Sequence, residues 1–121
     1  MKRLVAGVSH RERDIEELRE DRAYAVATLQ VAMESLDNPE ERAGGLIALR
    51  AVDEAYGGLG VVAAQAGISR ESLYRALSPK GNPTLKTLVA VLKTLGLRLS
   101  VADKQQAEAT QAKQGDDYAA A

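Results

Sequence analysis

The chain has 121 residues, 45% of them apolar, and a formal net charge of −1, which fits one small domain with an extension or a tail. Aromatic residues make up only 3%, so the core must be built from aliphatic side chains and alanine, a composition that favours helices over a β-sandwich. Cysteine is absent and histidine occurs once, at His10, which argues against disulfides, thiolate metal sites and imidazole chemistry. We therefore expect no enzyme, no catalytic residue, no metal and no cofactor.

The apolar segment near the N-terminus is too short to span a membrane or to act as a secretory signal. It ends at Ser9 and is followed by four charged residues over 11–14, whereas a membrane span needs about 18 apolar residues. We expect a cytoplasmic protein without a membrane partner.

Charge is distributed unevenly along the chain. Residues 57–100 contain six lysines or arginines against one acidic residue, Glu71, whereas residues 24–56 contain two basic against six acidic residues. Because local charge decides whether a surface attracts phosphate, the basic segment is a candidate for nucleic-acid binding. The acidic residues Glu34, Asp37, Glu40 and Glu41 are expected to form a solvated face, with a docking surface for a basic partner as the alternative.

The apolar spacing predicts helices over most of the first hundred residues. Residues 12–36 read as helix, either continuous or divided in two with Asp21 as the second N-cap. Asn38 is predicted to cap the next helix, with Pro39 at its first position and Glu41 completing a capping box, and Gly57-Gly58 ends it. We divide the chain into an N-terminal helical extension over 1–37, a DNA-binding domain over 38–101 and a flexible tail over 102–121.

The segment 59–78 has the features of a helix-turn-helix. Two short helices, 59–66 and 69–78, are joined by Gly67, which is placed where a positive φ is needed, and Ser69 is the expected cap of the second helix. Leu73, Ala76 and Leu77 form the predicted inner face of that helix.

A further helix and a short strand are expected to complete this domain. Asn82 and Pro83 are predicted to start the helix, which ends at Gly96. The alternation over 97–101 permits a short strand, and the fold class is therefore all-α with that possible addition.

The outer face of the second helix is the predicted DNA-binding surface. A recognition helix needs one buried side and one side whose polar groups reach base edges and phosphates. Lys80 and Asn82 follow it, beside the start of another helix, where backbone amides bind phosphate. The predicted DNA-binding residues are Ser69, Arg70, Glu71, Ser72, Tyr74, Arg75, Lys80 and Asn82.

The residues over 67–78, followed by Gly-Asn-Pro-Thr-Leu at 81–85 and Leu-Lys-Thr-Leu-Gly-Leu-Arg-Leu at 92–99, closely resemble the antidote (antitoxin) proteins of bacterial addiction modules. These proteins contain a helix-turn-helix of the phage Cro/repressor type, and the resemblance extends over about residues 14–101. It implies a homodimer that binds double-stranded operator DNA, represses its own operon and neutralises a small toxin, commonly a ribonuclease of the RelE-like fold. Two positions depart from the family pattern: Arg22 stands where proline is common, and Gly60 where a small polar cap is usual.

Two other functions remain open. A solitary Cro-type regulator without a toxin differs from an antitoxin only in whether the neighbouring gene encodes a small basic protein. A protein-interaction module would have no salt-sensitive affinity for DNA.

Overall fold

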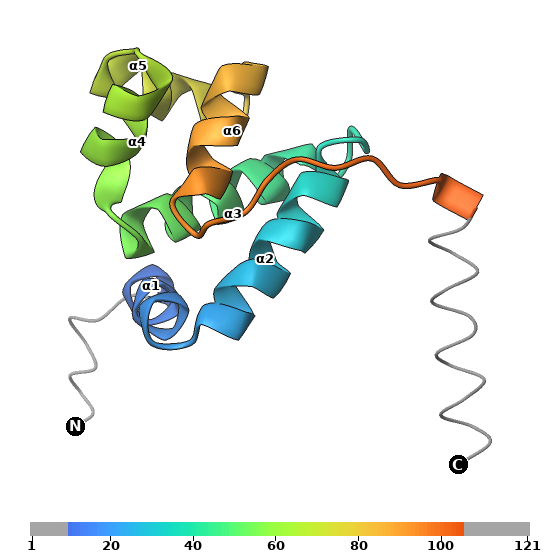
Figure 1. Cartoon of the computed structure of the whole chain (residues 1–121), viewed down its shortest axis with the longest axis horizontal. Helices are drawn as coiled ribbons and strands as arrows, with labels where there is room; N and C mark the ends of the chain where they lie inside the picture. The colour runs from blue at the N-terminus through green and yellow to red at the C-terminus, as the bar shows by residue number, and fades with distance from the viewer. Residues whose placement is uncertain (1–9, 106–121) are drawn as a thin grey trace.

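The computed structural model describes residues 10–105, and these residues form an all-helical fold (Figure 1). The predicted fold class is therefore confirmed. The helices are α1 (His10–Glu20), α2 (Arg22–Ser35), α3 (Arg42–Ala55), α4 (Gly58–Ala66), α5 (Arg70–Ala76) and α6 (Leu85–Lys93). Helix α3 packs against α1, α2 and α4, and it lies between the α1–α2 pair and the group formed by α4, α5 and α6 (Figure 1).

The long N-terminal helical segment is divided in two at Asp21. The Asp21 side chain accepts a hydrogen bond of 3.1 Å from the backbone N–H of Tyr24 and so caps α2. A second contact joins the two helices, because the Tyr24 hydroxyl donates to Asp14 at 2.8 Å. Of the two arrangements that the sequence left open, the structure has the two helices.

The predicted start of the third helix is wrong by a few residues. The Asn38 side chain accepts from the N–H of Glu40, two residues on, and so stabilises a turn rather than the helix. Helix α3 begins at Arg42, and Glu41 makes no side-chain capping bond. Close packing follows one turn later: a Cβ at Gly45 would lie 2.8 Å from the carbonyl oxygen of Ala32, so α2 and α3 approach each other closely there.

The turn between α4 and α5 has the predicted geometry. Gly67 has φ 71°, and the N–H groups of Gly67 and Ile68 bond back to the carbonyls of Ala64 and Ala63. This pair of hydrogen bonds is a Schellman motif, which closes a helix with a left-handed residue. Ser69 then caps α5, as expected.

The start of α6 corrects a second capping prediction. Thr84, not Asn82, is its N-cap and accepts a 3.1 Å hydrogen bond from the N–H of Thr87. Asn82 is held elsewhere, since its side-chain oxygen accepts from Arg42 at 2.9 Å. Helix α6 consequently begins at Leu85.

The possible strand over 97–101 is absent from the described residues: the Leu97 N–H bonds back to the Leu92 carbonyl at 2.9 Å, and no backbone bond joins 98–101 to another described segment. A lone segment cannot form a ladder, which explains its absence. Residues 106–121 of the predicted tail lie outside the described residues.

One hydrophobic core connects the N-terminal helices to the rest. Leu18 and Leu29 belong to the same buried cluster as Leu46 and Leu73, so the core extends across the expected boundary at residues 37 and 38. The Tyr56 hydroxyl donates to the Leu18 carbonyl at 2.6 Å, and Arg22 donates to the Leu95 carbonyl at 2.6 Å. The division into 1–37, 38–101 and 102–121 stays a prediction. Within residues 10–105, no helix is long and apolar enough to cross a membrane.

Candidate nucleic-acid interface

Helix α5 has one buried and one exposed side. Leu73 and Leu77 are fully buried, and they anchor the helix and its C-cap in the core. The four remaining large side chains of the helix are exposed: Arg70, Glu71, Tyr74 and Arg75. This division arises because positions 73 and 77 are four apart and lie on the same side of a helix.

The first turn of α5 is held by a pair of serines. The Ser69 hydroxyl accepts from the Ser72 N–H at 3.0 Å and lies 3.0 Å from the Ser72 hydroxyl. The Ser72 hydroxyl also accepts from Arg75 at 3.5 Å. Ser69 is exposed and Ser72 is half-buried, so the two serines order the exposed face of α5 as well as its cap.

Arg70 extends back over the helix that precedes it. A Cβ added at Gly60 would lie 3.7 Å from Nε of Arg70 and 3.8 Å from its Cζ. The Arg70 guanidinium therefore lies beside the first turn of α4. This glycine, which departs from the family pattern, leaves open the space next to the arginine.

Arg50 joins the site from α3, and the sequence did not predict it. Its Cζ lies 4.1 Å from the centroid of the Tyr74 ring, a cation–π geometry. Nε of Arg50 also lies 3.7 Å from Glu54, whose other oxygen pairs with Arg11 at 2.6 Å. No local pattern signals this contact, because positions 50 and 74 are brought together only by the packing of α3, α4 and α5.

The loop after α5 is fixed by Arg42. Its guanidinium donates to Asn82 Oδ1 at 2.9 Å and lies 3.5 Å from the Gly81 carbonyl. Gly81 is required for close approach, since a Cβ there would lie 2.1 Å from the Ala76 carbonyl oxygen at the end of α5. Lys80, next to this glycine, is exposed. Lys80 therefore follows the end of α5 closely in the chain, and its expected place beside the start of the next helix stays a prediction.

Helix α6 adds two lysines next to this surface. Lys86 and Lys93 line a hollow of about 400 Å³ together with Gln65 of α4. Nζ of Lys86 lies 3.2 Å from the position that a Cβ would take on Gly67, so this lysine is next to the turn between α4 and α5. Both lysines belong to the basic segment of the sequence, but only the fold places them beside the helix pair.

The exposed groups at this surface are mostly cations. Arg70, Arg75, Lys80, Lys86 and Lys93 are exposed, and Glu71 is the single carboxylate of their segment over 57–100. Among residues 10–105, no group of three or more His, Asp or Glu side chains could hold a metal ion. An exposed helix with guanidinium and ammonium groups around it has the chemistry that contacts phosphates and base edges.

One buried carboxyl lies behind this surface, on α3. Asp53 is fully buried and its two oxygens have no hydrogen-bond partner. Burial, with a smaller contribution from the neighbouring Glu54, raises the pKa of Asp53 to about 7. The sequence analysis did not identify this residue.

Comparison with known proteins agrees with the resemblance seen in the sequence. A model of the family described as "probable addiction module antidote protein" matches residues 11–103. An uncharacterised protein of Haemophilus influenzae (strain ATCC 51907 / DSM 11121 / KW20 / Rd) is 55% identical over 40 residues, which are 33% of this chain and 41% of that protein. No solved structure matches the chain. Because the family model matches most of its length, the chain belongs to the family of probable addiction module antidote proteins.

Proposed function

We propose that this chain is a DNA-binding antitoxin that represses its own operon and neutralises a small toxin of the RelE-like fold. Membership of the antidote family supports a toxin as the partner of this chain. The RelE-like fold of that toxin is implied only by the resemblance of residues 67–99. The DNA-binding part of the proposal rests on the contrast between the buried and the exposed side of α5. Leu73 and Leu77 are buried, while Arg70, Tyr74 and Arg75 are exposed within a basic surface.

In this proposal α5 enters the major groove and its neighbours contact the backbone. Arg70, Glu71, Tyr74 and Arg75 face the bases or the nearest phosphates. Ser69 and Ser72 order the first turn, and Asn82 keeps its loop in place through Arg42. Lys80, Lys86 and Lys93 neutralise phosphates on either side of the groove.

The protein acts as a homodimer in this proposal, since one seven-residue helix reads few base pairs and a two-fold axis doubles the site. The extended segment over 97–101 is the proposed contact. Leu99 is 37% and Val101 97% exposed, so both have apolar surface available for a second copy.

Fluorescence anisotropy with two duplexes tests the DNA-binding part. One duplex is the sequence upstream of the chain's own operon and the other is the same sequence scrambled, and each is titrated at several salt concentrations. We expect tighter binding to the upstream duplex and a linear fall of log K with log salt for both. Equal, salt-independent binding to both would overturn the proposal and favour a protein-interaction module. Operator binding without affinity for the product of the neighbouring gene would instead favour a solitary Cro-type regulator.

A further inference from the structure

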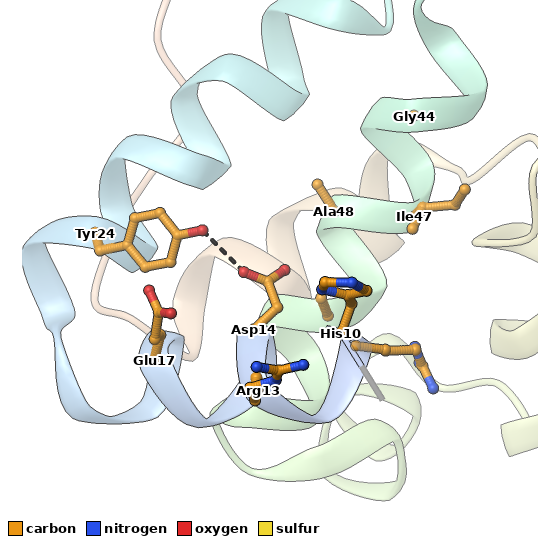
Figure 2. A pocket seen from close by; sticks show the side chains of 10 residues that line it. His10, Arg13, Asp14, Glu17, Tyr24, Gly44, Ile47 and Ala48 are labelled. Atoms are coloured by element: carbon orange, nitrogen blue, oxygen red, sulfur yellow. Dashed lines mark hydrogen bonds between the residues drawn. The ribbon is translucent and has the colours of Figure 1, made fainter. Parts of the chain in front are cut away.

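A groove runs between the N-terminal helices and α3, away from the basic surface. It consists of two hollows of about 570 and 580 Å³ that share Tyr24, Gly44 and Ala48 as lining residues. Figure 2 shows the first hollow, with Tyr24 and Asp14 on one side and Gly44, Ile47 and Ala48 of α3 on the other. Because the lining is shared, the hollows form one surface feature, called here the α2–α3 groove.

Small residues form the floor of the α2–α3 groove. Ala27 of α2 and Gly44 and Ala48 of α3 line it, and the last two lie four positions apart on one face of α3. A Cβ placed at Gly44 would meet nothing within 4 Å, so this glycine is not required for packing inside the chain. A groove with such a floor has room for an added helix to approach the backbone.

The walls of the groove are apolar and exposed. Val31 is 62%, Ile47 51% and Tyr24 38% exposed. All three line the groove, although they come from different turns of α2 and α3. Large apolar side chains that gather in one hollow mark an interaction site more often than isolated ones do.

The charged side chains that line the second hollow, the one that contains Val31, are all acidic. Glu40 and Glu41 line it, and no lysine or arginine lines that hollow. In the first hollow the lining has both signs, and Arg11 is already paired with Glu54 at 2.6 Å. A partner seated over Glu40 and Glu41 therefore gains by presenting basic side chains.

We propose that the α2–α3 groove binds an amphipathic helix of the toxin, with its apolar face on Val31 and Ile47 and its basic residues over Glu40 and Glu41. This inference rests on the proposed antitoxin function and names the surface through which it acts. An apolar helix face laid into a groove is a common mode of peptide recognition.

A second copy of the chain fits this groove less well. A two-fold contact whose axis passes near Glu40 and Glu41 would place these residues against the identical carboxylates. A contact that joins opposite ends of two grooves would bring Arg11 and Arg13 of the other copy to Glu40 and Glu41, but Arg11 is already paired with Glu54. A basic protein partner satisfies the groove and leaves the surface proposed for DNA free.

The two binding surfaces are separate. None of the eight predicted DNA-binding residues lines the groove. Helix α3 lies between the α1–α2 pair and the helices that bear the basic surface (Figure 1). A variant in the groove is therefore expected to change toxin binding without changing operator affinity.

The test fills the groove with a side chain for which the isolated chain has room. The full-length Gly44→Leu variant is titrated by calorimetry with the purified small protein encoded beside this chain, and by anisotropy with the operator duplex. We expect the affinity for the small protein to fall at least tenfold and the operator affinity to stay unchanged. Ala23→Leu is the matched control, because Ala23 is exposed on α2 and lines neither hollow.

A charge variant tests the orientation of the helix. Glu40→Gln with Glu41→Gln is expected to weaken binding of the small protein several-fold and to reduce its salt dependence. Glu34→Gln is the control, since Glu34 lines a different hollow beside Leu97 and Leu99.

Each result decides one of the two claims. If the unaltered chain binds the small protein and Gly44→Leu binds it equally well, the groove is not the docking site, although the antitoxin function stands. If the unaltered chain does not bind it at all, the antitoxin function fails and this inference fails with it. If Gly44→Leu instead lowers the sedimentation mass from dimer to monomer, the groove is an interface between copies and the proposal is overturned.

Discussion

The guanidinium carbon of Arg50 lies 4.1 Å from the centroid of the Tyr74 ring, so a residue of α3 covers one face of an aromatic side chain on α5. Tyr74 is still 41% exposed, which leaves the rest of its surface available to a ligand. Since Arg50 also pairs with Glu54 at 3.7 Å, the ring is linked to the main helical scaffold by a charged network.

The Arg50–Tyr74 contact is expected to contribute a measurable coupling energy. A double-mutant cycle with Arg50→Ala and Tyr74→Leu, followed by urea unfolding, should give about 0.5–1 kcal/mol, as for exposed cation–π pairs. Tyr74→Phe keeps the ring and should retain most of the coupling. Additive single effects would show that the two side chains are only neighbours.

Arg70 and Lys80 are expected to differ in how they affect DNA binding. A guanidinium paired with guanine contributes about 1–3 kcal/mol of discrimination, so Arg70→Ala should lose operator preference and keep most non-specific affinity. Lys80→Ala should weaken binding to every sequence and reduce the salt slope by about one counterion. Equal loss on operator and scrambled duplexes would make Arg70 a phosphate contact, and base reading would then fall to Glu71, Tyr74 or Arg75.

Gly67→Val should destabilise the fold. Its φ of 71° is strained for a β-branched residue, so we expect a loss of about 1–3 kcal/mol in the free energy of unfolding. Gly44→Ala is the matched control, since it lies within α3 with open space around its Cβ and should be neutral or stabilising by up to about 1 kcal/mol. An unchanged melting temperature for Gly67→Val would contradict the role given to this turn.

Asp53 should make the protein less stable as the pH rises. Its pKa is about 7 in the folded chain and 3.8 in the reference state, so between these values the folded state holds a proton that the unfolded state has released. The free energy of unfolding therefore falls with rising pH, by at most about 1.4 kcal/mol per pH unit.

Urea unfolding at pH 5 and pH 8 measures this dependence. Asp53→Asn should flatten it and be more stable than the unaltered chain at pH 8. Asp37→Asn is the control, because the Asp37 side chain is 79% exposed. If the free energy of unfolding depends on pH in the same way in Asp53→Asn and in Asp37→Asn, Asp53 is not the cause of that dependence.

Val101→Asp tests the proposed dimer contact. Val101 is 97% exposed and is not part of the buried core, so a charge there should leave the monomer folded. The same charge should weaken self-association if Val101 lies in the dimer contact. Sedimentation equilibrium should show a shift towards monomer together with weaker operator binding. An unchanged dimer would place the contact elsewhere, most simply at the N-terminal helices.

The sequence by itself determined the elements whose signals are local. Gly67 at a positive φ, Ser69 as the cap of α5 and the buried Leu73 and Leu77 are as predicted. Each depends on residues within one turn of helix, because capping bonds and the helical period act over three or four positions. Residues 67–78, 81–85 and 92–99 together carried the resemblance to antidote proteins.

Only the tertiary structure decided the features that join distant segments. Asn82 did not cap α6 because Arg42, forty positions away, holds its side-chain oxygen, and Thr84 took the cap. Through the angles at which the helices pack, Arg50 reached Tyr74, and Glu40 came to line the α2–α3 groove while Glu34 lines another hollow. Those angles follow from the summed burial of many side chains in a shared core, a quantity that no short stretch of sequence contains.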